Sequence, residues 1–511
     1  MSVDFHPCSL APRGRKPGRW ALGLCASFIA TIFVAAPSFG QPPLSPPKVI
    51  VIRPAAEPVP ALKYRLTYEA PEQVAGNAVV FYHRALELYL HRRANEKKPG
   101  ESVEDRISDW LKLPNRDFPR DQAKEALQDA RNFLNEVELG TKREDCNWEF
   151  THRDEGFALL LQDIQDTRSL ARFVALQIRL EVVEGRVDQA IRWLRVGFVF
   201  ARHVSNGNSA IQSLVGTAIG RMMMMEMEHL IQVPGAPNLC WAVAGLPRPF
   251  IDKDPAIMGE RYMLEREIPG LREVDSDVWS LEKARAFTTT LQSFLGMLNH
   301  TWAAAMVNSN GLEVSETPSM DDWGKRVVMA TMIARSYPEA KRSLIAEGRP
   351  AARVEAMPAI QAVTLYSMNL YVKSRDDLFK WLAMPYPLAY RGLEEAERRY
   401  SRMTSTSQLG IPFGAILPAM RAFLSASARS ERHLSALEVI EAIRLYAASH
   451  SGKLPASLDE ITEAPIMPDP ATNKPFEYKL DGNTATLSAP AIPGESPSDY
   501  NTLRYQLKLE N

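Results

Sequence analysis

The 511-residue sequence predicts a mainly α-helical protein with a small α+β tail at its C-terminal end. From about residue 75, apolar residues recur at three- and four-residue steps, a spacing typical of amphipathic helices. No alternating strand pattern occurs between residues 75 and 450. Alternation appears only near the C-terminus, on both sides of a tight-turn sequence. We therefore expect a multi-helix body, partly tetratricopeptide-like and solenoidal, followed by a tail with a β-hairpin.

The composition is that of an ordinary soluble globular protein, with 45% apolar and 24% charged residues. It excludes collagen-like, wholly disordered and polytopic membrane proteins. The formal net charge is −1. Because no strong electrostatic field draws such a chain to nucleic acid or anionic lipid, we expect neither as a partner.

The N-terminal 40 residues have the order of a secretory signal peptide. Arg13, Arg15, Lys16 and Arg19 form a basic cluster, and an uncharged apolar run follows at residues 20–36. Ser38 and Gly40 supply the small residues of a cleavage site before Gln41. We expect a cleaved signal and a periplasmic or secreted protein; an uncleaved anchor formed by residues 20–36 is the alternative. Cleavage would leave a mildly acidic chain that does not bind membranes.

Residues 41–62 contain seven prolines, which favour extended conformations. Val49–Ile52 has the character of a short strand, but we expect the whole segment to be a mostly disordered tether. The predicted domains are then a signal at 1–40, the tether, a helical body at 63–430 and a tail at 431–511.

The strongest helical pattern lies at residues 155–233. Two predicted helices, at 157–184 and 187–203, flank Gly185 and Arg186. This arrangement resembles one tetratricopeptide-like hairpin, with Ala190, Trp193 and Leu194 directed inward. A second copy at a 34-residue period is not evident in the sequence, so an array is not established.

The tail begins with a predicted helix that ends near Gly452. The sequences at 476–480 and 484–488 then alternate with period two around Asp481, Gly482 and Asn483, which predicts a β-hairpin. Residues 503–509 are a candidate third strand.

The tail resembles the C-terminal domain of type II secretion pseudopilins over about 60 residues. The matching residues are Gly452, Leu454, Pro455, Ser457, Leu458, Asp469, Pro470, Pro475, Phe476 and Tyr478. In pseudopilins this domain continues a helix that follows a class III leader, whereas here it ends a long chain, so filament assembly does not carry over. The resemblance also suggests a calcium ligand at Asp469. Calcium needs six or more oxygens, and Asp469 with Asp481 and Asp499 would supply too few, so we expect no metal site.

The whole layout resembles a group of large, uncharacterised exported bacterial proteins. The shared residues are Gly76, Asn77, Ala78, Phe81, Tyr82, Arg84, Ala85 and Leu86, then 238–252 and Glu260. That resemblance implies no activity and no cofactor.

The sequence contains none of the common catalytic or nucleotide-binding motifs. Asp252, Asp254 and Glu260 are weak catalytic candidates, because carboxylates on an irregular loop above a helical scaffold can form a site. A salt-bridged loop packed on the helices is the simpler interpretation. Whether the protein is an enzyme stays uncertain, although a non-enzymatic role is favoured.

Two cysteines, Cys146 and Cys240, follow the predicted signal. An even number of cysteines in an oxidising compartment allows a disulfide, and two buried free thiols are the alternative. The leading functional hypothesis is an exported scaffold or binding protein with protein partners in the cell envelope. The alternative is an exported hydrolase with a non-standard acidic site.

Overall fold

The computed structural model describes residues 44–95, 102–148, 156–294, 322–406 and 419–510, and for 156–165 it describes the backbone alone. The predicted signal peptide lies outside these residues. The described chain is mainly helical, with a small sheet formed largely by its C-terminal end, so the predicted fold class is confirmed. A solenoidal, tetratricopeptide-like array is not confirmed.

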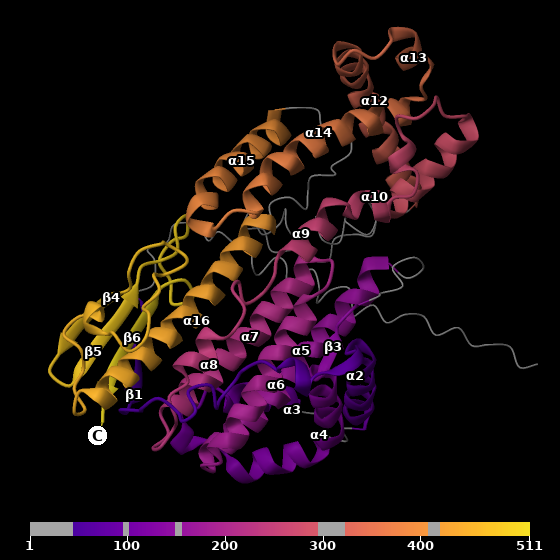
Figure 1. Cartoon of the computed structure of the whole chain (residues 1–511). Helices are drawn as coiled ribbons and strands as arrows, with labels where there is room; N and C mark the ends of the chain where they lie inside the picture. Colours follow the sequence, from indigo (N-terminus) through magenta and orange to yellow (C-terminus); the bar gives the residue numbers. More distant parts are fainter. Residues whose placement is uncertain (1–43, 96–101, 149–155, 295–321, 407–418, 511) are drawn as a thin grey trace, which may run out of the picture.

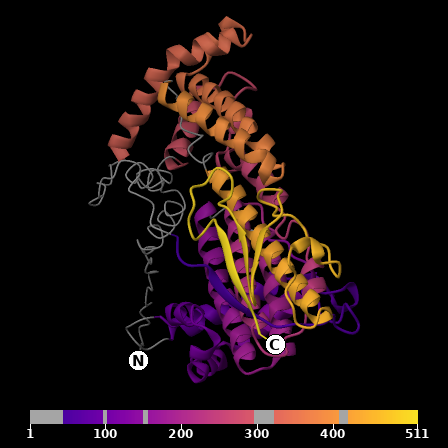
Figure 2. The ribbon, with the colours of Figure 1, turned by 90° about the vertical axis from the view of Figure 1, so that its left-hand side faces the viewer.

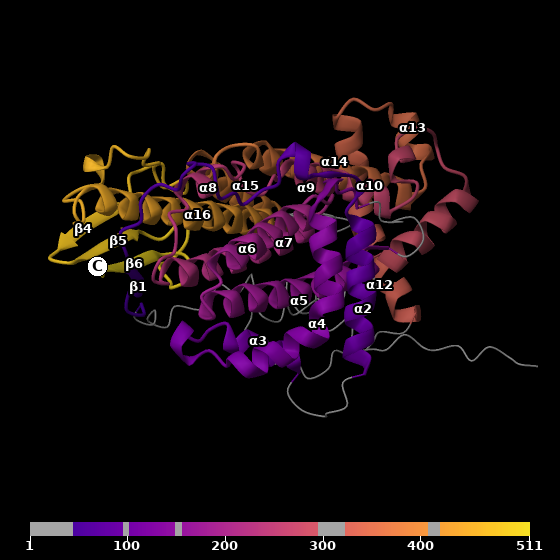
Figure 3. The ribbon, with the colours of Figure 1, turned by 60° about the horizontal axis from the view of Figure 1, so that its bottom comes forward.

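The first half of the chain forms a layered group of helices. Its members are α2 (Val79–Ala94), α3 (Val103–Trp110), α4 (Arg120–Thr141), α5 (Gly156–Val183), α6 (Val187–Ser205), α7 (Ala210–Ile231) and α8 (Cys240–Ala244). Figure 3 shows α2, α3 and α4 on one side of α5–α7, and the later helices on the other side. The α5–α6 hairpin turns at Gly185, whose φ of 74° suits glycine.

The second half extends away from this group. It contains α9 (Asp254–Arg261), α10 (Met263–Glu267), a helix at 281–294, α12 (Asp322–Ala346), α13 (Ala351–Ala356), α14 (Ala359–Leu382) and α15 (Tyr386–Thr406). Figure 1 places α12 and α13 at the end of the molecule opposite the sheet. The long helix α16 (Ala419–Ser449) connects this outer part to the sheet end.

The main sheet has four strands in the order β1-β6-β5-β4. They are β1 (Lys48–Ile52), β4 (Glu477–Asp481), β5 (Thr484–Ala489) and β6 (Leu503–Leu509). The predicted hairpin is present: Asp481 pairs with Thr484, and Gly482 has a φ of 59° in the turn between them. Figure 2 shows α16 running along this sheet. Phe476, just before β4, is buried in the same core as Leu437 and Ile440 of α16.

The prediction of a disordered tether at 41–62 is wrong for the residues around β1. Strand β1 pairs in parallel with β6, from Lys48 opposite Tyr505 to Ile52 opposite Leu509. Ile50 and Ile52 are fully buried. The flanking prolines limit the strand but do not interrupt it, and its partner lies more than 450 residues away, where no local pattern can reveal it.

A small second sheet was also not expected. Strand β2 (Val74–Asn77) pairs in parallel with β3 (Arg143–Asp145) beside the N-terminal helices. Both strands have four residues or fewer, so they are too short to give a clear period-two pattern.

The predicted boundary at residue 430 falls inside α16. Two hydrophobic clusters divide the described chain differently. One combines buried residues at 50–251 with those at 434–509, and the other lies mainly within 256–428. The tail is therefore not a separate unit, because its sheet and the second half of α16 share a core with the N-terminal helices.

Glu228 of α7 joins three distant parts of this first core. Its carboxylate accepts hydrogen bonds from Tyr505 of β6 at 2.5 Å and from Lys48 of β1, and it lies 2.8 Å from Nε2 of His433 in α16. Only 1% of Glu228 is exposed. Burial acts to raise the pKa of Glu228, but the bonds from His433 and Lys48 outweigh it and lower that pKa. The ionised carboxylate thus connects β1, β6 and α16.

Candidate functional site

Two of the three acidic candidates from the sequence accept hydrogen bonds from backbone N–H groups. Asp252 is exposed, and its Oδ1 accepts a hydrogen bond from the backbone N–H of Asp254 at 3.0 Å. Glu260 is buried, and its Oε1 accepts the N–H of Ala210 at 2.8 Å, at the start of α7. In the described ranges, no hydrogen bond or ion pair joins Glu260 to either aspartate.

Burial raises the pKa of Glu260, while its bond from Ala210 opposes that rise. A raised pKa in a carboxylate is a common property of catalytic acids. Here, however, the carboxylate caps a helix whose first N–H groups lack helical partners, which is a sufficient structural reason for its position. The prediction that these acids form a site gains no support from the geometry.

Cys146 and Cys240 do not pair: both are buried free thiols. The Cys146 Sγ donates to the backbone oxygen of His203 at 3.4 Å, beside α6. Cys240 starts α8, next to Asn238, whose side chain donates to the Glu441 backbone of α16. Burial raises the pKa of Cys240 to about 12 and raises that of Cys146 as well, so neither thiol is poised for chemistry at neutral pH.

In the part of the chain described, no group of three or more His, Cys, Asp or Glu side chains could hold a metal ion. At Asp469 the two carboxylate oxygens are occupied by other partners. They accept bonds from the Arg432 guanidinium, from the N–H of Ala471 and from the hydroxyl of Thr472. A guanidinium group therefore occupies the position that the pseudopilin resemblance suggested for calcium.

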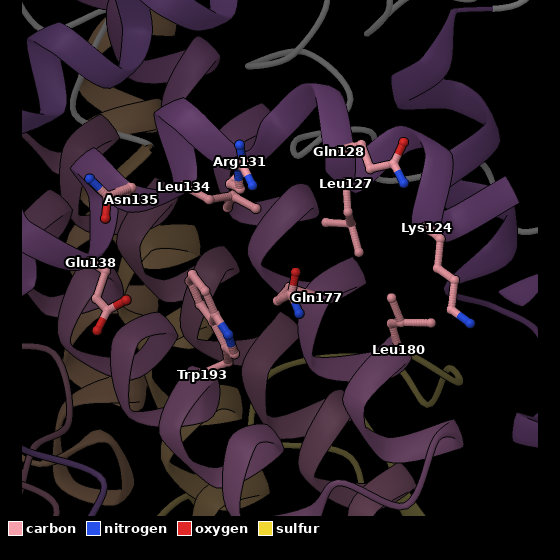
Figure 4. Close-up of a pocket in the computed structure, with 10 residues that line it drawn as sticks. All are labelled: Lys124, Leu127, Gln128, Arg131, Leu134, Asn135, Glu138, Gln177, Leu180 and Trp193. Carbon is pink, nitrogen blue, oxygen red and sulfur yellow. The ribbon is translucent and has the colours of Figure 1, made fainter. Parts of the chain in front are cut away.

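A concave surface lies between α4, α5 and α6, and we call it the α4–α6 groove. It has a volume of about 350 Å³ and is open to solvent. Its lining residues are Lys124, Leu127, Gln128, Arg131, Leu134, Asn135, Glu138, Gln177, Leu180 and Trp193. Figure 4 shows these side chains converging from the three helices.

The floor of the α4–α6 groove is apolar. Leu127 and Leu134, one on each side of Arg131 along α4, are buried, as is Leu180 of α5. The indole of Trp193 is half-buried and faces this floor. The sequence predicted Trp193 to point inward, but the structure places it at the edge of the groove, where part of its ring stays exposed.

The rim is polar and follows one side of α4. Gln128, Arg131 and Asn135 are exposed and follow each other at three- and four-residue steps, so they lie on one helix face. None of the three has a hydrogen-bond or ion-pair partner within the described ranges. Across the groove, Gln177 of α5 donates to Glu181 at 2.6 Å.

The remaining charged groups of the lining are already paired. Arg192 of α6 donates to both oxygens of Glu138, at 2.6 and 2.5 Å, and Lys142 adds a third bond at 3.0 Å. Burial acts to raise the pKa of Glu138, but the bonds from Arg192 and Lys142 outweigh it and lower that pKa. Lys124 pairs with Glu184 at 2.5 Å. Of the charged residues in the lining, Arg131 has no partner within the described ranges, so its guanidinium can pair with an external group.

The lining of the groove combines apolar, amide and charged side chains. Its ten residues are three leucines, one tryptophan, two glutamines, one asparagine, two cations and one glutamate. An apolar floor with a half-exposed aromatic ring and a rim of amides is a composition suited to holding a polypeptide segment.

No protein-family model, curated protein or solved structure matches this chain.

Sequence reasoning missed this groove, although one signal was present. The residues at 124, 128, 131, 135 and 138 form a polar line at helical spacing directly beside the apolar residues at 127 and 134. Such a boundary occurs on any amphipathic helix. Only the placement of α5 and α6 shows that this boundary borders a concave surface.

Proposed function

We propose that the protein is an exported, non-enzymatic binding or scaffold protein of the cell envelope, and that its α4–α6 groove holds a segment of a protein partner. The observation that carries the proposal is the combination, in one concave surface, of a buried leucine floor, a half-exposed Trp193 and unpaired polar groups on the rim. Buried aromatic anchors surrounded by polar rims are typical of protein interfaces.

The polar rim suits an extended segment in particular. A polypeptide that lies in a groove must satisfy its own backbone N–H and C=O groups. The amides of Gln128 and Asn135 supply both donors and acceptors, and in the described structure they have no other partners. The groove has room for a few side chains rather than for a folded domain.

Export is proposed from the sequence of residues 13–40. Among the described residues, no helix is long and apolar enough to cross a bilayer. Mass spectrometry of the native protein tests export: a mature N-terminus near Gln41 is expected, and an intact N-terminus in the membrane fraction would support the anchor instead.

The resemblance of the tail to pseudopilin C-terminal domains is kept as a proposal. The order of helix, irregular loop and hairpin supports it. The tail is integrated with the N-terminal helices through a shared core, which supports a structural role within this chain rather than independent assembly.

Site-specific photo-crosslinking in the native cell envelope tests the binding proposal. A photoreactive residue at Gln128, exposed in the groove, should give an adduct with a second polypeptide. The same residue at Glu125, exposed on α4 but outside the lining, is the matched control. Filling the groove by Asn135→Trp should remove the adduct, whereas Asp129→Trp, exposed on the same helix, should not. Equal adducts at positions 125 and 128, or none at 128, would contradict the proposal.

A further inference from the structure

We propose that the segment held by the α4–α6 groove is acidic, with a carboxylate side chain next to an apolar one, and that Arg131 selects it. This inference rests on the proposed function and specifies the partner. It goes beyond that function because it assigns a chemical class to the bound segment and a specificity role to one residue.

The charges of the lining carry the argument. Lys124 and Arg131 are cationic and Glu138 is anionic. Glu138 already accepts bonds from Arg192 and Lys142, so it offers little attraction to a further cation. Lys124 is paired with Glu184. Among the described residues, the guanidinium of Arg131 is therefore the charged group of the lining that has no partner and can pair with a ligand.

An exposed guanidinium beside an apolar floor favours a carboxylate ligand. Arginine presents two parallel N–H groups that match the two oxygens of a carboxylate, and such charge-assisted pairs are stronger than neutral hydrogen bonds. On α4, Arg131 lies between Leu127 and Leu134, one turn from each. A carboxylate on Arg131 thus brings the neighbouring side chain of the ligand over the leucine floor.

Trp193 supplies the second contact. Its half-exposed ring faces the leucines from α6, and Arg192 lies over the same ring at 5.8 Å. An apolar or aromatic side chain of the ligand, packed between this ring and Leu180, would remove both surfaces from water. One carboxylate and one apolar side chain, close together in an extended segment, therefore match Arg131 and the apolar floor.

Fluorescence anisotropy with the purified mature protein tests the inference. Three labelled peptides share an apolar core and differ at one position, which is Asp, Asn or Lys. We expect the Asp peptide to bind about threefold more tightly than the Asn peptide, and the difference to shrink as salt rises. Arg131→Gln should abolish the preference, and Arg131→Glu should transfer it to the Lys peptide. Arg116→Gln is the control, since Arg116 is exposed and away from the groove.

The outcomes separate this inference from the proposed function. Equal binding of all three peptides to the wild-type protein would overturn the acidic preference but leave a polypeptide-binding groove. A preference that survives Arg131→Gln would assign selection to another residue and overturn the role of Arg131. Failure of all three peptides to bind would contradict both the inference and the function on which it rests.

Discussion

The guanidinium of Arg432, in α16, donates to both carboxylate oxygens of Asp469, at 3.0 and 2.8 Å. Both residues are almost fully buried. Arg432 also donates to the backbone oxygens of Pro490 and Asn501, so one side chain on the long helix fixes three irregular segments of the tail. This explains how a tail with little regular structure keeps its position against α16.

Removing the carboxylate of Asp469 should destabilise the protein strongly. Asp469→Ala leaves the Arg432 charge buried without its partner, and breaking a buried ion pair in this way costs about 3–5 kcal/mol. Urea denaturation should show the loss as a lower midpoint. Asp481→Asn, in the exposed hairpin turn, is the control and should change the free energy of unfolding little. Similar stabilities for the two variants would contradict the structural role of the pair.

Strand β1 should belong to the cooperative core. Ile50→Ala removes a fully buried side chain, and such a truncation costs about 2–5 kcal/mol in the free energy of unfolding. Val49→Ala, one residue earlier, removes a side chain that is 51% exposed, so we expect a much smaller loss. Thermal unfolding followed by circular dichroism compares the two. An equal, small effect of both changes would show that the segment is a tether after all.

Cys146 and Cys240 should stay free and unreactive in the folded protein. A thiol reagent at pH 7 should label neither Cys146 nor Cys240 until denaturant is added, because both are buried and burial raises the pKa of each. Mass spectrometry after labelling counts the modified residues. Rapid labelling of the native protein, or a disulfide that survives denaturation without reductant, would contradict the structure.

Stability should fall as the pH drops from 6.5 towards 4, partly because of His203. Burial, assisted by the nearby charge of Arg202, lowers the pKa of His203 to about 4 from an ordinary value of 6.5. The unfolded chain therefore takes up a proton first. The stability from neutral His203 is complete above pH 6.5 and decreases below it, by about 2 kcal/mol at pH 5.

Comparing pH profiles isolates this contribution. His203→Gln should flatten the decrease in the free energy of unfolding between pH 6.5 and 5. The variant also alters the hydrogen bond between Tyr82 and residue 203, so its stability at pH 7 can differ from that of the wild type without affecting this test. His229, whose pKa burial lowers to about 3, leaves a residual slope of the same sign. His450→Gln, at an exposed position, is the control. An unchanged slope in His203→Gln would show that this histidine does not titrate as proposed.

Local patterns predicted the helices and the hairpin well, because both depend on neighbouring residues. The helices expected at 157–184 and 187–203, for example, are α5 and α6, and the turn at Gly482 lies where its sequence placed it. Strand β1 was missed because its partner is β6, at the other end of the chain. The boundary predicted at residue 430 falls inside α16, because this helix enters two hydrophobic clusters, which composition along the chain does not show.

The candidate site was less predictable still. Asp252, Asp254 and Glu260 are close in sequence. Glu260, in α9, is buried against the start of α7, whereas Asp252 remains at the surface. The α4–α6 groove combines residues from three helices between positions 124 and 193. Its lining depends on how these helices pack, which the helical period of each one alone does not determine.

A titration of the Asp peptide into the purified protein tests the central claim, that the α4–α6 groove and not the segment with Asp252 and Asp254 is the functional surface. Three proteins are compared: the wild type, Trp193→Ala and the double variant Asp252→Asn with Asp254→Asn. We predict that Trp193→Ala weakens binding by at least about tenfold while its circular dichroism spectrum stays that of the wild type, and that the double variant binds as the wild type does. Normal binding by Trp193→Ala together with loss of binding in the double variant would contradict the account.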